Sequence, residues 1–599
     1  MSKIFKVFYD ISSIDFDSDD AYFVWKRSAI KPKGVTFLDE VIDEFSIEIR
    51  SMVLKEIKEV GIFISNVVTQ SFFGYSESWQ KSWAVSHFSE LANLEKSQTF
   101  SMLAQVTAIE LFAKKNVSII LIGFPTLLRD SLTKLIDRKL TVRKLSFFNK
   151  NLWVFTKSLI FFSRMLLSSM INSLIVKRIP HDTYGLIFID YLYQFDDQRK
   201  HDAKFLRYWG ELPDLITSQR LPPTLWIHKF VKSSETPDLK TARSVVKGFN
   251  SVCAKRNQVH VLLEDYLRPI NAIRSFIEFI KIVQLILRLE RKLLLGGNNL
   301  TWVMNTFEWR RSFFSAELFS HLADGAAIRN LLHGRSGSKS TLVYVYENQP
   351  WEYLANEEAA KCGISRSIAS VQGSIRFWDL RYAVTPRRVH DCGGEKVFMP
   401  AVLASNGQDA TNKLEKSNSL KFLKPVESYR MSSLRGNVDP SLSDWKILVV
   451  GEYSEKMTKR LIDIVNEAVE TVELDVEVCL LPHPATKKSF EEELKQLLTL
   501  TMIREMDSRT IVLADANSSF VLEAIFSGSP VICFIDDDNL NFSPLYKENG
   551  ILFTRNSDEM SAEIRSIING GYHGFEGAED FFYSSYGSNN WTTLLNGDS

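Results

Sequence analysis

The sequence predicts an α/β protein built on parallel sheets and divided into more than one domain. Short apolar runs rich in Val, Ile and Leu recur along the chain, and stretches with helical spacing separate them. Strands that alternate with helices in this way form parallel sheets covered on both faces. Because 599 residues are too many for one compact core, two or three domains are expected.

The clearest α/β series lies near the C-terminus. Apolar runs over 476–481 and 510–514 each end in a polar turn and are typical of buried parallel strands. A helix is predicted over 520–526 and a third strand over 530–535. In such a sheet the loops at the carboxyl ends of the strands line the ligand-binding crevice. The two polar turns are therefore the first candidates for a binding site.

These two turns carry side chains suited to a phosphate. His483 stands between Pro482 and Pro484, where its imidazole can donate to a phosphoryl oxygen; alternatively, it only caps the turn. Ser518 and Ser519 precede the predicted helix, whose free backbone N–H groups favour an anion. The same two serines also fit a plain helix N-cap.

Two further residues of this region are candidates for nucleotide binding. Glu523 lies one turn into the predicted helix and either accepts bonds from ribose or sugar hydroxyls or is a solvated helix residue. Gly451 ends a predicted strand that begins at Lys446, a position where nucleotide-binding loops commonly lie.

Strands are also predicted earlier in the chain, over 117–122, 184–190, 225–228, 259–263, 341–347 and 367–372. Polarity rises and regularity falls over 385–443, so the domain boundary is placed near residue 395. The predicted domains are 1–395, an N-terminal α/β domain with helical insertions, and 396–599. A run over 397–407 is expected to be a strand entering the second domain. The last 25 residues are expected to form a loose tail or to cross back to the first domain.

Several motifs resemble known families. Residues 208–213, 346–352 and 374–382 resemble bacterial surface carbohydrate biosynthesis proteins. The His-Pro pair at 483–484 and the Asn-Ser-Ser run at 517–519 resemble GT-B glycosyltransferases of the sialyltransferase and Kdo-transferase type, which use CMP-activated acidic sugars. This resemblance implies two Rossmann-like domains that face each other across a cleft, with the donor nucleotide on the second and the acceptor on the first.

The same resemblance implies a function. It points to a glycosyltransferase in the biosynthesis of a cell-surface polysaccharide such as lipopolysaccharide, O-antigen or capsule, working without an obligatory metal or other cofactor. Its substrates would be a nucleotide sugar, in the first place CMP-linked, and a glycan acceptor that can be lipid-linked. In similar sialyltransferases the serine motif contacts the CMP phosphate. The alternatives are a transferase that uses UDP or another NDP-sugar, and a non-catalytic carbohydrate-binding scaffold of the envelope assembly complex.

Acidic residues of the first half are candidates for a catalytic base, because an inverting transferase must take a proton from the acceptor hydroxyl. Glu347 ends a predicted strand, and Glu352 lies on the first turn of the next helix. Two carboxylates so close predict a raised pKa for one of them. Alternatively, Glu352 only complements the helix dipole. Glu211 ranks level with Glu347, because similar sialyltransferases carry an acidic residue on the acceptor side, and Asp214 is a third candidate.

Five residues that follow the strand over 367–372 are candidates for binding the substrate. Gln372 and Ser374 offer hydrogen bonds beside a glycine. Arg376, Asp379 and Arg381 surround two aromatic residues, and cations with aromatic rings suit an acidic or sugar ligand. The alternative is a packing loop held together by Arg–Asp pairs.

Composition excludes other classes. A formal net charge of zero gives no global field for nucleic acid. The five cysteines show no metal-ligand spacing and favour a reducing cytoplasm. No signal peptide is evident at the N-terminus. The Asp-rich runs at 15–19 and 536–538 are predicted to be solvated turns, and no metal site is expected. The segment 334–341 differs from a P-loop because serine, and not glycine, precedes its lysine.

Two segments, 152–176 and 273–295, combine apolar and basic residues. Charges near the middle of a membrane span cost about 3 kcal/mol each, so a transmembrane helix is not expected. The alternatives are core helices or amphipathic helices that rest on a membrane. The predicted location is the cytoplasm, at the inner face of the cytoplasmic membrane if these helices bind lipid.

Overall fold

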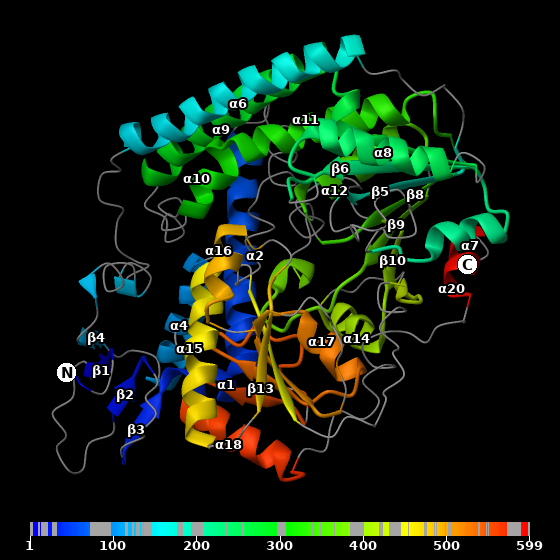
Figure 1. Cartoon of the computed structure of the whole chain (residues 1–599). Coiled ribbons are helices and arrows are strands. Elements are labelled where there is room, and N and C mark those ends of the chain that lie inside the picture. The colour runs from blue at the N-terminus through cyan, green and yellow to red at the C-terminus, as the bar shows by residue number, and fades with distance from the viewer. Residues whose placement is uncertain are drawn as a thin grey trace.

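Figure 1 shows the computed structural model of the chain. It describes residues 4–9, 12, 22–26, 33–71, 98–113, 118–122, 125–126, 132–133, 136, 147–175, 184–192, 208–233, 236–253, 257–295, 307–337, 339–347, 349–364, 366–383, 400–417, 423–429, 445–452, 454–472, 476–483, 486, 488–497, 499–500, 506, 508–536, 540–546, 548, 550–571 and 589–596. Within them the chain forms three parallel sheets, and the predicted α/β class is confirmed.

The largest sheet has seven strands in the order β11-β10-β9-β8-β5-β6-β7. Its strands are β5 (Leu186–Leu192), β6 (Thr224–Phe230), β7 (Gln258–Leu262), β8 (Thr341–Val345), β9 (Arg366–Val371), β10 (Val402–Ser405) and β11 (Leu423–Pro425). The chain adds strands to one side of β5, then crosses to β8 and builds the other side. The order therefore reverses between β5 and β8, as in a Rossmann fold.

Helices cover both faces of this sheet, and the alternation along β5 shows how. Ile187 and Ile189 pack in one core with residues of α11 and α12, whereas Leu186 and Phe188 pack in the other with residues of α7 and α8. The helices are α7 (Leu212–Ser218), α8 (Leu239–Cys253), α11 (Ala316–Leu332) and α12 (Pro350–Lys361). Burial on both faces explains why these strands are apolar throughout.

The second sheet has six strands in the order β14-β13-β12-β15-β16-β17, which reverses between β12 and β15. Its strands are β12 (Lys446–Val450), β13 (Glu477–Leu481), β14 (Thr499–Leu500), β15 (Thr510–Asp515), β16 (Val531–Phe534) and β17 (Leu552–Thr554). The helices are α15 (Glu455–Val472), α16 (Lys488–Leu494), α17 (Phe520–Phe526) and α18 (Ser557–Ile568). This second Rossmann-like unit contains the strands and the helix predicted over 476–535.

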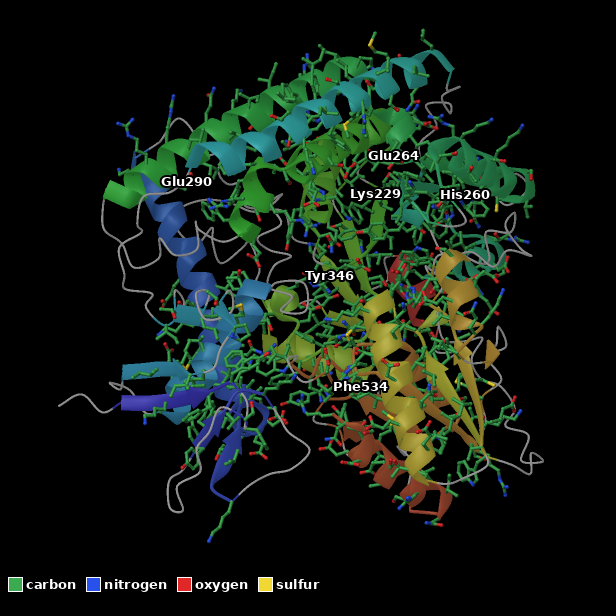
Figure 2. All side chains as sticks on the ribbon, turned by 60° about the vertical axis from the view of Figure 1, so that its left-hand side comes forward. Lys229, His260, Glu264, Glu290, Tyr346 and Phe534 are labelled. Atoms are coloured by element: carbon green, nitrogen blue, oxygen red, sulfur yellow. The ribbon has the colours of Figure 1, made fainter. Side chains whose placement is uncertain are left out.

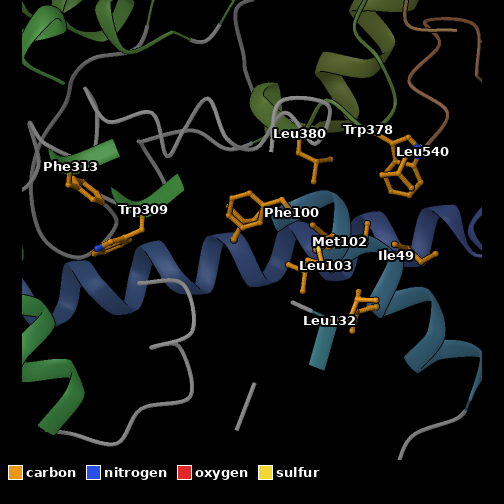
Figure 3. Packing of buried hydrophobic residues seen from close by; sticks show 14 of the residues in the cluster. Ile49, Phe100, Met102, Leu103, Leu132, Trp309, Phe313, Trp378, Leu380 and Leu540 are labelled. Carbon is orange, nitrogen blue, oxygen red and sulfur yellow. The ribbon is translucent and has the colours of Figure 1, made fainter. Parts of the chain in front are cut away.

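A third unit, which the sequence did not reveal, precedes both. It has four parallel strands in the order β3-β2-β1-β4, namely β1 (Ile4–Phe8), β2 (Tyr22–Val24), β3 (Val35–Phe37) and β4 (Ser118–Ile122). Its helices are α1 (Leu38–Glu44), α2 (Ser46–Ser71) and α4 (Gln98–Phe112). Figure 3 shows Ile49 and Phe100 of this unit in one cluster with Trp378, and with Leu540 from the six-stranded unit.

The two large sheets divide between β11 and β12, so the expectation that the run over 397–407 enters the second domain is wrong. The run predicted over 397–407 contains β10, which pairs with β9 in the seven-stranded sheet, and β11 pairs with β10 in turn. The sheet therefore ends at β11, and the next sheet begins at β12. Helix α14 (Gln408–Ser417) connects β10 to β11.

The end of the chain returns to the seven-stranded unit. Helix α20 (Asn590–Asn596) begins where the carboxylate of Glu427 accepts from the backbone nitrogens of Asn590 at 2.7 Å and Trp591 at 3.1 Å. The indole of Trp591 packs edge-on against Trp209 at 5.9 Å between ring centres. The described part of the last 25 residues therefore crosses back to the first of the two predicted domains, which confirms one of the two expectations for this segment.

Two long helices and one short helix complete the seven-stranded unit. They are α6 (Phe147–Ile175), α9 (Pro269–Leu295) and α10 (Phe307–Phe314). In Figures 1 and 2, α6 and α9 run side by side across the end of the molecule farthest from α18.

Candidate functional site

The reversal of strand order marks where each large sheet can bind a ligand, because the loops on either side diverge there and leave a crevice. In the seven-stranded sheet, Tyr191 lies near the end of β5, and Glu347 follows β8. In the six-stranded sheet, Gly451 follows β12, and Asn517 lies in the turn after β15. Each of these positions is at a carboxyl strand end.

The loops of the two sheets touch at these ends. The guanidinium of Arg376, in the loop after β9, donates through Nη2 to the backbone oxygen of Asn517. Figure 2 shows Tyr346, at the end of β8, on the side of the seven-stranded sheet nearest the six-stranded unit. The structure therefore brings the loop predicted to bind substrate against the loop predicted to bind nucleotide.

Glu352 is the most unusual group on the seven-stranded side. Its side chain is only 1% exposed, and its Oε1 accepts from the backbone nitrogen of Glu347 at 2.8 Å. Its Oε2 has no hydrogen-bond partner within the described part of the chain. Burial raises the pKa of Glu352 well above its ordinary value, and the nearby charge of Glu347 adds to the rise. The predicted raised pKa of one carboxylate is confirmed for Glu352.

Glu347 itself is half-buried and surrounded by phenols. Its Oε1 accepts from Tyr208 Oη at 3.3 Å. Tyr191 lies nearby, and its hydroxyl accepts from Trp351 Nε1 at 2.7 Å. Burial, followed by the charges of Glu347 and Glu352, raises the pKa of Tyr191 well above its ordinary value. The phenol of Tyr191 therefore favours its protonated form, so it can donate to an oxygen ligand but is not suited to act as a base.

The structure separates the two carboxylates that the sequence ranked level. Glu211 lies at the N-cap of α7 with an exposed side chain, and Asp214 is on the first turn of that helix. From the same motif it is Tyr208 that reaches Glu347. The chain turns at Gly210 with φ +46°, where a Cβ would lie 2.6 Å from the backbone oxygen of Tyr429. Sequence reasoning missed Tyr208, although it opens the motif that drew attention to Glu211.

Two of the predicted substrate-binding residues satisfy each other. Arg381 donates through Nε and Nη2 to the carboxylate of Asp379, with a shortest distance of 2.6 Å. Asp379 is the main group that favours the charged form of Arg381, whose pKa lies well above its ordinary value despite the opposing effect of burial. This bidentate pair is the packing loop considered as the alternative for these two residues.

The remaining three residues of this set lie on the loop toward the six-stranded unit. Gln372 is buried and donates from Nε2 to Ser370 Oγ at 2.7 Å. Ser374 is half-buried. Arg376 makes the contact to Asn517 described above.

On the nucleotide side, Gly451 and His483 lie next to each other. The backbone nitrogen of Gly451 donates to the oxygen of Leu481 at 2.9 Å, and a Cβ on Gly451 would lie 3.2 Å from the nitrogen of His483. His483 is half-buried, and its carbonyl accepts from the nitrogen of Thr486 at 2.8 Å. Pro484, predicted to shape this turn, lies outside the described residues. The glycine lets the ends of β12 and β13 approach closely.

The serine turn after β15 is built around Asp515. Its Oδ1 accepts from the nitrogen of Asn517 at 2.8 Å, and Ser518 Oγ accepts from the nitrogen of Phe520 at 3.4 Å. Ser519 occupies the N-cap of α17 without a side-chain cap bond. Because α17 has only seven residues, its dipole gives little support for an anion, and the bond that Ser518 accepts from Phe520 is a local turn bond one residue before the N-cap. Glu523 is 6% exposed, so the solvated alternative for this residue is wrong.

Among the described residues, no group of His, Cys, Asp and Glu side chains is arranged to hold a metal ion. A cavity of about 400 Å³ lies at the ends of β16 and β17, between the six-stranded unit and α1. Its wall includes Asp39 and Arg555, which form an ion pair at 3.0 Å, and Asp43, which accepts from the hydroxyl of Tyr546 at 2.5 Å. These pairs join the first unit to the six-stranded unit.

The chain matches no protein-family model and no curated protein. Among solved structures it is similar to S. aureus MnaA in complex with UDP, at 10% identity over 69% of this chain and 95% of that chain, with a TM-score of 0.36. It is also similar to UGT89C1 of Arabidopsis thaliana complexed with UDP, at 10% identity over 69% of this chain and 98% of that chain, with a TM-score of 0.34. Likeness at this level carries no argument about function, which has to rest on the site itself.

Proposed function

We propose that this protein is a glycosyltransferase of the GT-B type. The six-stranded unit would bind a nucleotide sugar, and the seven-stranded unit would bind the acceptor. One observation carries the proposal. Two Rossmann-like sheets meet at the carboxyl ends of their strands, where Arg376 in the loop after β9 donates to the backbone oxygen of Asn517, with a pair of carboxylates on one side and the Gly451–His483 turn on the other.

In this proposal Glu347 is the base. It takes the proton from the acceptor hydroxyl, whose oxygen forms a bond to the anomeric carbon as the bond from that carbon to the phosphate oxygen breaks. The nucleotide leaves with the electron pair, and a hydrogen bond from the imidazole of His483 stabilises the charge on its phosphate. Glu347 is favoured over Glu211 because it lies at the strand-order reversal and holds a bond from Tyr208.

Glu352 serves as a positioning residue for the base. Its Oε1 accepts from the backbone nitrogen of Glu347, and burial raises the pKa of Glu352 well above its ordinary value, which favours its neutral form.

The proposed donor is a CMP-linked acidic sugar and the proposed process is the assembly of a bacterial surface polysaccharide. Both rest on the sequence motifs at 483–484, 517–519 and 346–352. Two alternatives must be separated from this proposal by experiment. One is a transferase that uses UDP or another NDP-sugar, and the other is a scaffold that binds carbohydrate without catalysis.

The test is a panel of CMP-, UDP-, GDP- and dTDP-sugars, assayed for release of free nucleotide by the full-length protein. We expect turnover with the CMP-sugar. Preference for another nucleotide would replace the proposed donor and keep the transferase. No turnover with any donor, together with binding of a glycan, would indicate the scaffold.

The base is tested with a matched pair of variants. Glu347→Gln should lower kcat about 100-fold or more while nucleotide affinity stays close to wild type, because a base acts on the acceptor only. Glu211→Gln, an identical chemical change in the same unit, should keep at least half the rate. If the two results are exchanged, Glu211 is the base, and if both variants keep full activity, neither residue is.

A further inference from the structure

Helices α6 and α9 form a layer over α11 whose inner side is fixed by specific contacts. The rings of Phe162 and Phe276 stack at 4.0 Å between centres, and both pack edge-on against Phe319 of α11. Asn172 Nδ2 donates to the backbone oxygen of Glu264 at 3.3 Å. These ring contacts and this hydrogen bond fix which side of α6 faces the protein, and therefore also which side faces outward.

The outward side of α6 is apolar. Ile160, Leu167, Ile171 and Leu174 are all exposed, Leu167 by 59% and Leu174 by 87%. They are separated by seven, four and three residues, which places them on one stripe of the helix, and Arg164 falls within the same stripe. Leaving such a stripe in water is costly, because each buried Leu or Ile side chain contributes about 1.5–3 kcal/mol.

The outward side of α9 continues this surface. Ile270, Ile273 and Ile277 are exposed on its first three turns, and Leu287 is exposed on a later turn. Figures 1 and 2 show the two helices side by side in both views. We call the surface formed by these exposed residues of α6 and α9 the α6–α9 face.

Exposed cations accompany the apolar residues. They are Lys157 and Arg164 on α6, and Arg274, Lys281, Arg288, Arg291 and Lys292 on α9. Helix α6 contains no acidic residue, and α9 contains two. One of these, Glu290, is 2% exposed, and burial raises its pKa to about 7. The other, Glu278, pairs with Lys281 at 3.7 Å. The α6–α9 face is therefore strongly basic as well as apolar.

We propose that the α6–α9 face binds the surface of an anionic membrane, with both helices parallel to the bilayer. An amphipathic helix with an apolar stripe and Lys or Arg beside it binds at the boundary between headgroups and acyl chains. Long basic side chains can direct their charges to the headgroups while their carbon chains cover apolar surface. None of the described helices combines the length and apolar character that a membrane crossing needs, so attachment would be peripheral.

A second copy of the chain fits the face less well. A two-fold interface sets the same surface against itself, so the cations of one copy would meet those of the other. Like charges brought together with partial loss of solvent repel each other. An anionic bilayer offers both an apolar layer and the opposite charge, which is why lipid is the favoured occupant.

The test is flotation of the full-length protein with vesicles of phosphatidylglycerol and phosphatidylcholine, compared with phosphatidylcholine alone. One variant combines Leu167→Glu with Ile171→Glu, and another combines Lys281→Glu with Arg288→Glu. All four side chains are exposed, so none of them belongs to the packed core. The control is Ile47→Glu on the first turn of α2, at a position that is 72% exposed and outside the face.

We expect the wild type and the control to bind anionic vesicles at low salt and to detach at high salt, because charge at a membrane surface is screened. Each double variant should bind at least about tenfold more weakly, because one loses the burial of two apolar side chains and the other loses two basic residues that each contribute about 1 kcal/mol near anionic lipid. Equal binding to neutral vesicles, or unchanged binding of both double variants, would overturn the proposal. So would concentration-dependent dimerisation that the variants abolish without any vesicle binding. The assay reads binding alone, so its result does not depend on the proposed transferase activity.

Discussion

Replacing Glu352 first by glutamine and then by leucine separates its role as a hydrogen-bond acceptor from its role as a charge. In the native protein its Oε1 accepts from the backbone nitrogen of Glu347 at 2.8 Å, in a buried environment. Glutamine keeps an oxygen at that position and cannot ionise. Leucine removes the acceptor, so the N–H of Glu347 loses its partner, at a cost of about 1–3 kcal/mol.

We therefore expect Glu352→Leu to be about 1–3 kcal/mol less stable than Glu352→Gln at pH 7, measured by urea unfolding followed by tryptophan fluorescence. The kcat of Glu352→Leu should also fall, because the backbone nitrogen of Glu347 has lost the acceptor that positions it. Glu352→Gln should keep most of the activity, since its amide oxygen can still accept from the backbone nitrogen of Glu347. A leucine variant with normal stability and normal kcat would show that this bond does not position Glu347.

The pH dependence provides a second check with a definite sign. The folded pKa of Glu352 is raised, so between the unfolded pKa, near 4.5, and the folded pKa the native state holds a proton that the unfolded state has released. Wild-type stability should therefore fall as pH rises through this window, by up to about 1.4 kcal/mol per pH unit from this group. Glu352→Gln should lack that contribution. If the free energies of unfolding of the two proteins change in parallel with pH, the raised pKa of Glu352 is refuted.

Two further predictions concern His483 and Glu290. His483→Ala should weaken nucleotide binding or slow turnover by about 1.5–3 kcal/mol, the range for a hydrogen bond to a charged group. An unchanged nucleotide affinity in titration calorimetry, together with an unchanged kcat, would remove His483 from the site. Burial raises the pKa of Glu290 to about 7. The free energy of unfolding of the wild type should therefore fall by about 3 kcal/mol between pH 4.5 and 7 relative to that of Glu290→Gln. The amide oxygen of that glutamine can still accept from Trp309 Nε1, so the variant removes only the titration. Equal slopes in urea unfolding would contradict that pKa.

The sequence predicted individual elements well, because their signals are local. The strand predicted over 510–514 is β15, Thr510–Asp515, and the helix predicted over 520–526 is α17, Phe520–Phe526. A strand buried on both faces must be apolar throughout, and a helix between two such strands must be apolar at helical spacing. Neither property depends on which strand lies beside it.

Sheet membership could not be predicted in the same way. The loss of regularity after residue 385 suggested a boundary near 395, yet β10 at Val402–Ser405 pairs with β9 across that stretch. The length and composition of a connection do not say whether the next strand joins the same sheet. β10 joins this sheet because it pairs with β9, more than thirty residues earlier in the chain. The residues of β10 themselves do not show which strand will be their partner.

At the site, the sequence found the right segments but could not assign roles within them. Asp379 and Arg381 were predicted to bind substrate, but they lie two residues apart on one turn and satisfy each other. Glu211 and Glu347 were ranked level because nothing in their neighbours shows which lies at a strand-order reversal. Tyr208, whose hydroxyl donates to Glu347, lies 139 residues before it in the sequence, so no local pattern connects the two.

The placement of the two proposals within the fold has a consequence for how the protein would work. Glu347 and the α6–α9 face both belong to the unit built on the seven-stranded sheet, whereas the proposed nucleotide site belongs to the six-stranded unit. If lipid holds the first unit, an acceptor carried on a lipid stays on the same side as the base, and the nucleotide unit remains in contact with the solvent from which its donor comes. Binding to vesicles should then lower the KM for a lipid-linked acceptor and leave the KM for the nucleotide sugar unchanged. A change in the nucleotide KM alone would show that membrane and acceptor do not share this unit.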